Sequence, residues 1–214
     1  MTKHKQMTGF RKLVAVWGTA VFLAAGHGAY AASTHTPIFN SSEIASPRIN
    51  LFSKWRGALE LYFNDRKLPG RSCEASFLNR CHLREWSEFL AKLKGQGAIS
   101  PVYEVNRYMN RVRYIIDPRN YGVPDYWATP KQFLTRSGDC EDYAIAKYLS
   151  LRALGFPPSQ LRVVVLQDLN LKIAHAILVV YLDNQIRGVV NARTIHHYKA
   201  IYSINEKYWW LHRS

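Results

Sequence analysis

The chain has 214 residues, of which 48% are hydrophobic, 21% charged and 13% aromatic. This composition is that of an ordinary globular protein, and it excludes long disorder, a collagen-like repeat and a coiled coil. The net charge of +14 suggests nucleic acid as a first partner. Three cysteines are too few for a disulfide-rich scaffold and too sparse for a four-ligand zinc site.

Residues 1–31 have the pattern of a secretory signal peptide. A basic start precedes an apolar run over 13–25, and Ala29-Tyr30-Ala31 then supplies an A-x-A cleavage site. The run is shorter than the roughly 20 residues that a bilayer-spanning helix needs. We therefore predict cleavage after Ala31, with an uncleaved membrane anchor as the alternative. The mature form would lie in the periplasm without spanning the membrane.

Export also changes how the net positive charge is interpreted. The signal peptide holds four basic residues and no acidic one, so the mature chain keeps a charge of +10. An exported protein does not meet the chromosome, and we therefore expect no nucleic-acid partner. Export permits disulfides, so Cys73 and Cys81 either form a bridge or remain two separate thiols. Cys140 has no obvious partner in either case.

The first half of the mature chain predicts helices. Residues 32–49 lack periodicity and predict a loose leader before a single domain over 50–214. Apolar spacing and capping signals predict helices near 50–64, near 82–94, from Ser100-Pro101, from Thr129-Pro130-Lys131-Gln132, and over 141–154.

The second half predicts strands. β-Branched residues dominate 161–166 and 174–182, and shorter candidates lie at 187–190 and 194–204. Helices followed by strands, without alternation, indicate an α+β fold with an antiparallel sheet.

Cys140 has the surroundings of a catalytic nucleophile. It lies in Ser137-Gly138-Asp139-Cys140, where a turn meets the predicted helix over 141–154. Free backbone N–H groups and the helix dipole stabilise a thiolate or an oxyanion at such a position. A nucleophilic cysteine needs a base, and His175, 35 residues further on, is the candidate. The alternative is that both are ordinary buried residues.

Three carboxylates flank this cysteine. Asp139, Glu141 and Asp142 raise the pKa of a neighbouring thiol and oppose catalysis unless a positive charge neutralises them. Carboxylate oxygens suit Ca²⁺, so a bound calcium ion would supply that charge. The alternative is that the carboxylates only complement the helix dipole.

Several separated blocks resemble the bacterial transglutaminase-like cysteine proteinases, the family of the LapG-type periplasmic adhesin proteases. The most specific block is Gly138-Asp-Cys-Glu-Asp142, and the resemblance extends over roughly residues 50–214. The other blocks are Asp125-Tyr-Trp-Ala-Thr-Pro130, Leu151-Arg-Ala-Leu-Gly155, Leu161-Arg-Val163, His175-Ala-Ile-Leu-Val-Val180 and the closing run over 202–212.

The resemblance implies a papain-like fold of transglutaminase type, with Cys140 as nucleophile and His175 as general base. It implies calcium bound by Asp139, Glu141 and Asp142. It further implies a protein substrate, a large surface adhesin cut near its N-terminus so that cells leave a biofilm. The implied partner is an inner-membrane receptor that responds to cyclic di-GMP and sequesters the enzyme.

Two residues compete for the third catalytic position. The family places an Asp in a Leu-Asp-Asn block, which Leu182-Asp183-Asn184 matches, so we predict Asp183. This residue lies only eight positions after His175, about half the spacing in the family and about 26 Å along a straight strand. If residues 183–184 form a hairpin turn, antiparallel pairing instead sets His175 opposite residue 191 or 192. Asn191 would then orient the imidazole, as in Cys-His-Asn sites.

Three functions therefore remain to be distinguished. The leading one is an exported calcium-dependent cysteine endopeptidase. Acyl transfer to an amine, as in a transglutaminase, uses the same machinery. The short segment between His175 and Asp183 motivates a third, a catalytically impaired binding protein.

Overall fold

The computed structural model describes residues 35–67, 82–183, 185–190 and 197–213. The predicted signal peptide, the cysteines at 73 and 81, and Asn191 lie outside these ranges, so the predictions about them stay predictions. In the described part, no helix is both long enough and apolar enough to cross a membrane.

Helices come first along the chain and most strands follow. The helices are α1 (Ser53–Lys67), α2 (His82–Leu93), α3 (Ile99–Met109), α4 (Asp117–Asn120), α5 (Pro130–Arg136) and α6 (Cys140–Ala153), with 3-10 turns η1 (Ile38–Asn40), η2 (Ile49–Leu51) and η3 (Pro158–Gln160). The strands are β1 (Ser42–Ser46), β2 (Leu161–Asp168), β3 (Ile173–Leu182), β4 (Gln185–Val190), β5 (Tyr198–Ile204) and β6 (Trp209–Arg213).

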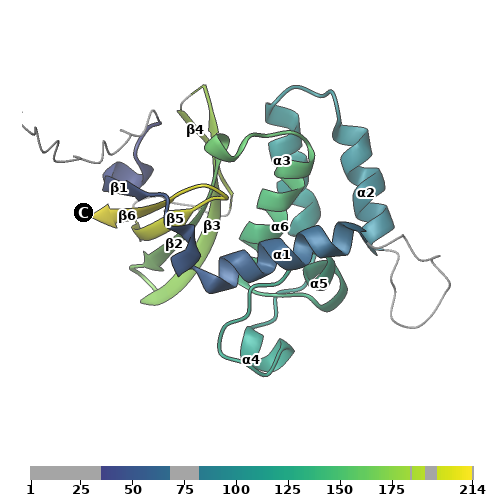
Figure 1. The fold of residues 1–214 in the computed structure, drawn as a ribbon, viewed down its shortest axis with the longest axis horizontal. Helices are drawn as coiled ribbons and strands as arrows, with labels where there is room; N and C mark the ends of the chain where they lie inside the picture. Colours follow the sequence, from purple (N-terminus) through teal and green to yellow (C-terminus); the bar gives the residue numbers. More distant parts are fainter. Residues whose placement is uncertain (1–34, 68–81, 184, 191–196, 214) are drawn as a thin grey trace, which may run out of the picture.

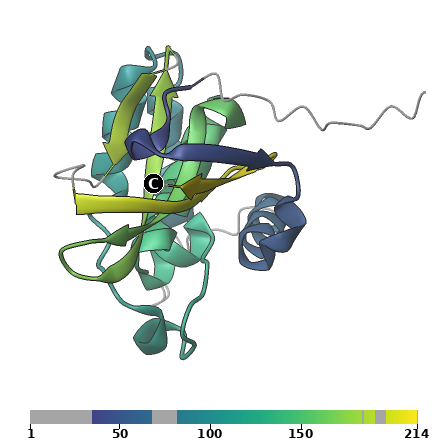
Figure 2. The ribbon, with the colours of Figure 1, turned by 90° about the vertical axis from the view of Figure 1, so that its left-hand side faces the viewer.

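The strands form one antiparallel sheet in the order β1-β6-β5-β2-β3-β4. Figure 1 shows the helices gathered on one side of this sheet, and the view turned by 90° places the sheet in front of them (Figure 2). The predicted α+β fold with an antiparallel sheet is confirmed.

The central helix of this layer is α6. Every residue from 142 to 151 is buried, because the sheet covers one side of the helix and other helices cover the rest (Figure 1). Ile145 and Leu149 share a core with Leu178 and Val180 of β3. A helix buried all round carries no polar stripe, so the position of α6 is fixed by packing on every side.

The sheet is apolar on its other face as well. Alternate residues of β2 and β3, among them Val164, Ile177 and Val179, form a second core with Ile38 of η1. Because successive strand residues point to opposite faces, burial of both faces requires an almost continuous apolar run. This explains the Leu161–Leu166 and Ala176–Leu182 runs.

One predicted helix cap is present in the structure and another is not. Thr129 and Gln132 form the predicted capping box at the start of α5. The third helix, however, begins at Ile99 and has no side-chain cap. The Ser100 hydroxyl lies 2.9 Å from Gln96 Oε1 and donates to it instead of capping the helix.

The segment predicted as a loose leader holds an edge strand of the sheet. Residues Ser42–Ser46 pair with β6, and Glu43 forms a 2.7 Å ion pair with Arg162 of β2. The two side chains are only 5% and 2% exposed. The prediction for this part of 32–49 is therefore wrong, because a five-residue strand held by a buried charge leaves no apolar periodicity in the sequence.

A buried histidine completes this edge. His212 Nδ1 lies 2.7 Å from Ser41 Oγ, and Nε2 lies 2.9 Å from Ser203 Oγ. The Ser41 hydroxyl already donates to the Ile38 carbonyl, so it accepts from a protonated Nδ1. Burial lowers the pKa of His212 to about 4, although the nearby Glu43 carboxylate acts in the opposite direction. The imidazole is therefore neutral near pH 7.

We predict that this histidine makes the fold acid-sensitive. Since its pKa is depressed in the folded state, its contribution is complete above pH 6.5 and is lost as the pH falls toward 4, by about 3 kcal/mol in total. The His212→Gln protein should be less stable at pH 7 but lose less stability on acidification. Urea unfolding at pH 7, 6, 5 and 4.5 measures this.

His82, half-buried at the start of α2, supplies the control, and His82→Gln should keep the wild-type pH dependence. If the free energy of unfolding changed with pH by the same amount in wild type and in His212→Gln, the assignment would be contradicted.

Candidate active site

Cys140 is the first residue of α6. Ser137, at φ 73°, and Gly138 lead the chain from α5 into it. A Cβ on Gly138 would lie 2.1 Å from Asp142 Oδ2, so only glycine fits beneath this carboxylate. The turn and the helix start thus place the cysteine where the sequence predicts it.

The Cys140 sulfur has a polar contact on each side. Its thiol donates to Glu141 Oε2 over 3.2 Å, and the backbone N–H of Ala176 donates to the sulfur. Burial raises the pKa of the thiol, and the charge of Glu141 raises it further, followed by that of Asp139. The Ala176 hydrogen bond lowers it but is outweighed. Burial and the neighbouring carboxylates therefore both favour the protonated thiol.

His175 directly precedes Ala176 on β3, so its backbone lies beside the nucleophile. Its ring stacks near Tyr198, with 6.3 Å between ring centroids. Burial lowers the pKa of His175, and the negative charge of Asp168 partly opposes this effect. Among the described residues, no hydrogen bond joins the imidazole to the sulfur. A neutral imidazole can accept a proton, and in apo enzymes the distance from base to nucleophile is often long.

A buried lysine also affects the pKa of His175. Lys147 is only 1% exposed, and its Nζ lies 5.5 Å from the centre of the Tyr143 ring. It lies seven residues after Cys140, two helical turns further on the same side of α6. Burial lowers its pKa to about 7, and its charge further lowers the pKa of His175.

Asp183 does not reach His175. It lies in the turn between β3 and β4, at φ 53°, and Leu182 pairs with Gln185 on either side of that turn. His175 is near the other end of β3, and the strand runs without reversal between them. The structure does not bring Asp183 to His175, because the chain turns between the paired residues Leu182 and Gln185.

The same hairpin carries β4 back toward the start of β3. Its last described pair is Leu178 with Val190. Asn191 follows directly in the chain but lies outside the described residues, so the third catalytic residue stays a prediction.

The three predicted carboxylates belong to a larger acidic cluster. Asp139 and Asp142 have oxygens within 4.8 Å of one another and of an Asp117 oxygen, and the same limit holds for the group Asp117, Asp125 and Glu141. Asp117 and Asp125 were not identified from the sequence as members of this cluster. Asp125 opens the Asp125–Pro130 block, which was the only signal available.

The cluster fits a hard cation. Asp117 Oδ1 and Asp139 Oδ1 are buried without a hydrogen-bond partner, a costly state unless a positive charge meets them. Burial raises the pKa of Asp142 to about 8, and burial also raises the pKa values of Asp117 and Glu141. Oxygen ligands of this number and kind suit Ca²⁺.

Hydrogen bonds hold the cluster in place. Asp142 Oδ1 accepts from the Ala128 N–H over 2.7 Å, and Asp142 Oδ2 accepts from the Asp139 N–H over 3.2 Å. The Asp117 N–H donates to Asp139 Oδ2 over 3.1 Å. Three segments of the chain therefore meet at the start of α6.

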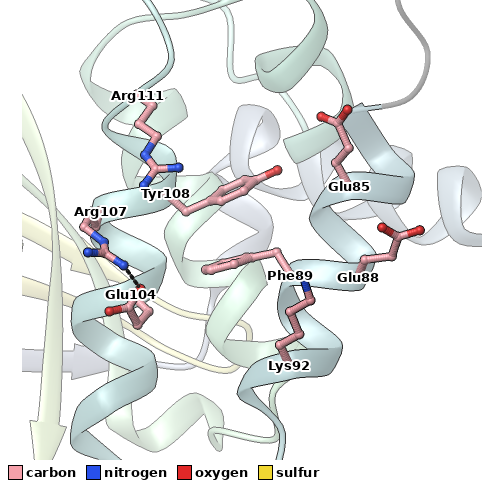
Figure 3. Close-up of a pocket in the computed structure, with 8 residues that line it drawn as sticks. All are labelled: Glu85, Glu88, Phe89, Lys92, Glu104, Arg107, Tyr108 and Arg111. Atoms are coloured by element: carbon pink, nitrogen blue, oxygen red, sulfur yellow. Dashed lines mark hydrogen bonds and ion pairs between the residues drawn. The ribbon is translucent and has the colours of Figure 1, made fainter.

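A surface hollow between α2 and α3 lies on helices that hold none of these groups. It measures about 380 Å³, and the rings of Phe89 and Tyr108 stack in it with 4.2 Å between centroids. Figure 3 shows these two rings pointing toward each other, with the charged lining residues around them. It contains no nucleophile, so it is separate from the candidate active site.

The fold and the site together define a transglutaminase-like cysteine peptidase. A family model described as bacterial transglutaminase-like cysteine proteinase BTLCP matches residues 72–212, so the chain belongs to this family. A search of curated proteins found no match.

Solved structures of LapG from Legionella pneumophila are similar to the chain. The calcium-bound form is 28% identical with a TM-score of 0.54, covering 73% of this chain and 86% of that one. The EGTA-treated form gives the same values. A third LapG structure is 29% identical with a TM-score of 0.53, covering 72% and 87%. The transglutaminase-type fold is confirmed.

We predict that Glu141 suppresses the reactivity of the nucleophile in the absence of a divalent cation. Glu141→Gln removes both the hydrogen-bond acceptor and the charge that raise the thiol pKa, so alkylation of Cys140 by iodoacetamide in EGTA becomes faster, most clearly above pH 9, because burial raises the pKa of Glu141 to about 9. The thiolate fraction rises about tenfold for each unit of pKa. The rate should be measured from pH 7 to 10 by mass spectrometry.

Glu88→Gln, on the exposed side of α2, is the matched control and should react like the wild type. An unchanged or slower rate in Glu141→Gln would contradict the prediction.

Proposed function

We propose that the protein is an exported, calcium-dependent cysteine endopeptidase that cuts a large surface adhesin near its N-terminus and so releases cells from a biofilm. The observation that carries the proposal is the sulfur of Cys140. It stands at the start of α6 beside the backbone of Ala176, one residue from His175, in a chain of a cysteine proteinase family.

The residues support a thiol mechanism. His175 takes the thiol proton, and the Cys140 sulfur attacks the scissile carbonyl carbon to form a tetrahedral intermediate. Backbone N–H groups at the start of α6 are placed to hold the oxyanion. The carbon–nitrogen bond then breaks, and the amine leaves with the proton from the imidazolium. Water, deprotonated by His175, hydrolyses the thioester and restores the thiol.

Calcium is proposed as the resident cation, held by Asp117, Asp139, Glu141 and Asp142, with Asp125 at the edge of the cluster. When bound, it would supply the positive charge that offsets these carboxylates beside the thiol. The oxygen-only donors and the two unpartnered buried oxygens support this assignment. A similar protein, Legionella LapG, has been solved in a calcium-bound form.

Partners and location are proposed from the sequence. The predicted signal peptide supports a periplasmic enzyme, and the family resemblance supports an adhesin substrate. It also supports sequestration by an inner-membrane receptor that responds to cyclic di-GMP. The basic charge of the chain is compatible with docking on acidic partners of this kind.

Calcium should stabilise the mature protein through this cluster. We expect millimolar CaCl₂ to raise the melting temperature by several degrees, since ligand that binds only the folded state stabilises it. Asp117→Asn should lose most of that shift, while Glu88→Gln, outside the cluster, keeps it. Differential scanning fluorimetry with CaCl₂, MgCl₂ and EGTA measures the effect. Equal shifts in the two variants would contradict the site.

Calcium should also be required for cleavage. We expect the mature protein to cut a purified N-terminal adhesin fragment in CaCl₂ and not in EGTA, with Cys140→Ala and His175→Ala inactive. Because the β3–β4 hairpin turns at 183, Asp183→Ala should retain activity, and Asn191→Ala should lose at least about tenfold. Cleavage is followed by gel electrophoresis and product mass.

The products also decide between the functions. Cleavage by Cys140→Ala would contradict the proposal. Crosslinked products with amine donors would indicate a transglutaminase, and an inert Cys140 with intact substrate binding would indicate a binding protein.

A further inference from the structure

The helix α1 is tied to the chain segment that borders the acidic cluster. Asp65, near the end of α1, accepts a hydrogen bond from the Thr129 hydroxyl over 3.1 Å and another from Lys131 Nζ over 2.9 Å. Thr129 caps α5, and Figure 1 shows α1 passing beside that helix. One end of α1 is therefore fixed next to the segment over 125–129, which supplies contacts to the cluster.

The other end of α1 places a lysine on the cluster itself. Lys54, the second residue of α1, forms an ion pair with Asp125 Oδ2. The next residue, Trp55, is fully buried, donates from Nε1 to the Asn205 carbonyl over 3.1 Å and packs edge-on against Trp127, with 6.3 Å between ring centroids. The backbone that carries Lys54 is therefore held by the core, and its ammonium group reaches Asp125 from a fixed position.

Asp125 belongs to the cation site as well as to this ion pair. Its ligand oxygen and those of Asp117 and Glu141 lie within 4.8 Å of one another. Asp117 is only 1% exposed, and its Oδ1 has no hydrogen-bond partner among the described residues. A cation bound at this point and the ammonium group of Lys54 would therefore share one carboxylate.

Two positive charges on one carboxylate oppose each other. The side chains of Lys54 and Asp125 are 48% and 49% exposed, so solvent and salt screen part of the repulsion. At such a site, a single charge beside a divalent ion changes the Kd of the ion by roughly three- to tenfold. The family model matches residues 72–212, so its match does not include Lys54.

We propose that Lys54 is a built-in competitor for the cation site and sets the calcium concentration at which the cluster fills. In the absence of calcium, its ammonium group neutralises Asp125 and so stabilises part of the cluster. Calcium binding to Asp125 has to weaken this ion pair, and the positive charge at position 54 therefore raises the Kd for calcium. The inference rests on the proposed calcium-dependent function and names how its cation site is regulated.

A series of charges at position 54 tests the inference without requiring turnover. The Kd for calcium is measured by isothermal titration calorimetry with CaCl₂ on the mature wild type, Lys54→Arg, Lys54→Met and Lys54→Glu. Lys54→Arg should keep the wild-type Kd, Lys54→Met should bind about three- to tenfold more tightly, and Lys54→Glu more tightly still. The difference should shrink when NaCl is raised from about 0.1 M to about 1 M, because the Debye length falls from roughly 10 Å to 3 Å.

Arg56 supplies the matched control on the same helix. Its side chain is 47% exposed, as Lys54 is, but it pairs with Glu60 of α1. Residues two positions apart on a helix face different directions, so Arg56→Met should keep the wild-type Kd. Melting temperatures measured in EGTA show that each variant is folded.

The sign of the change decides the role of Lys54. A Kd that stays the same in Lys54→Met and Lys54→Glu, or that rises in both, overturns the inference, because Lys54 would then be neutral toward the site or would hold Asp125 in place as a ligand.

The adhesin-cleavage assay separates this inference from the proposed function. Tighter calcium binding in Lys54→Met and Lys54→Glu, without calcium-dependent cleavage by the wild type, supports the inference and overturns the function. Calcium-dependent cleavage together with an unchanged Kd in the variants overturns the inference and leaves the function intact. If none of the five proteins binds calcium, the cation site and the inference are both overturned.

Discussion

The carboxylate of Asp142 holds the candidate site together. It accepts one hydrogen bond from Ala128, in the segment before α5, and one from the Asp139 backbone, and it sits where only Gly138 leaves room. These contacts join the segment over 112–129 to the start of α6, the position of the nucleophile. The cost is a buried carboxyl group two residues from a thiol, whose pKa burial raises to about 8, in a site that already contains Asp139 and Glu141.

That cost is the reason a cation is proposed for this cluster. Without one, burial and the carboxylates raise the pKa of Cys140, while burial and Lys147 lower the pKa of His175, so the uncharged form of each partner is favoured. A divalent ion in the cluster would offset the carboxylate charges and so lower the pKa of the Cys140 thiol. Structural integrity and activation would then depend on the same oxygens, and this accounts for a nucleophile surrounded by groups that suppress it.

Part of this site could be predicted from the sequence because its signals are local. Cys140 at a helix start, the Thr129–Gln132 capping box and the strand carrying His175 each depend on a few neighbouring residues. Asp117 and Asp125 could not be recognised in the same way. They come from the start of α4 and from the segment after it, 14 to 25 residues before the other carboxylates, and only the folded chain brings them there.

Two other sequence predictions, for the segment that forms β1 and for Asp183, failed for a related reason. The strand β1 is held by the buried Glu43–Arg162 pair, a contact across 119 positions that no periodicity reveals. Asp183 matched a motif in residue type, but the antiparallel register of the hairpin, rather than residue type, decides what lies near His175. In both cases the pairing of strands, rather than residue type or periodicity, was decisive.

The central claim is that Cys140 becomes covalently acylated by a cleaved polypeptide. Rapid acid quenching of the mature protein with an adhesin fragment in CaCl₂, followed by intact-mass and peptide mass spectrometry, measures this directly. The account predicts a transient thioester that links the N-terminal product to Cys140 and is absent in EGTA. Cleavage in calcium that proceeds at full rate in Cys140→Ala, with no adduct on the wild-type cysteine, would contradict it.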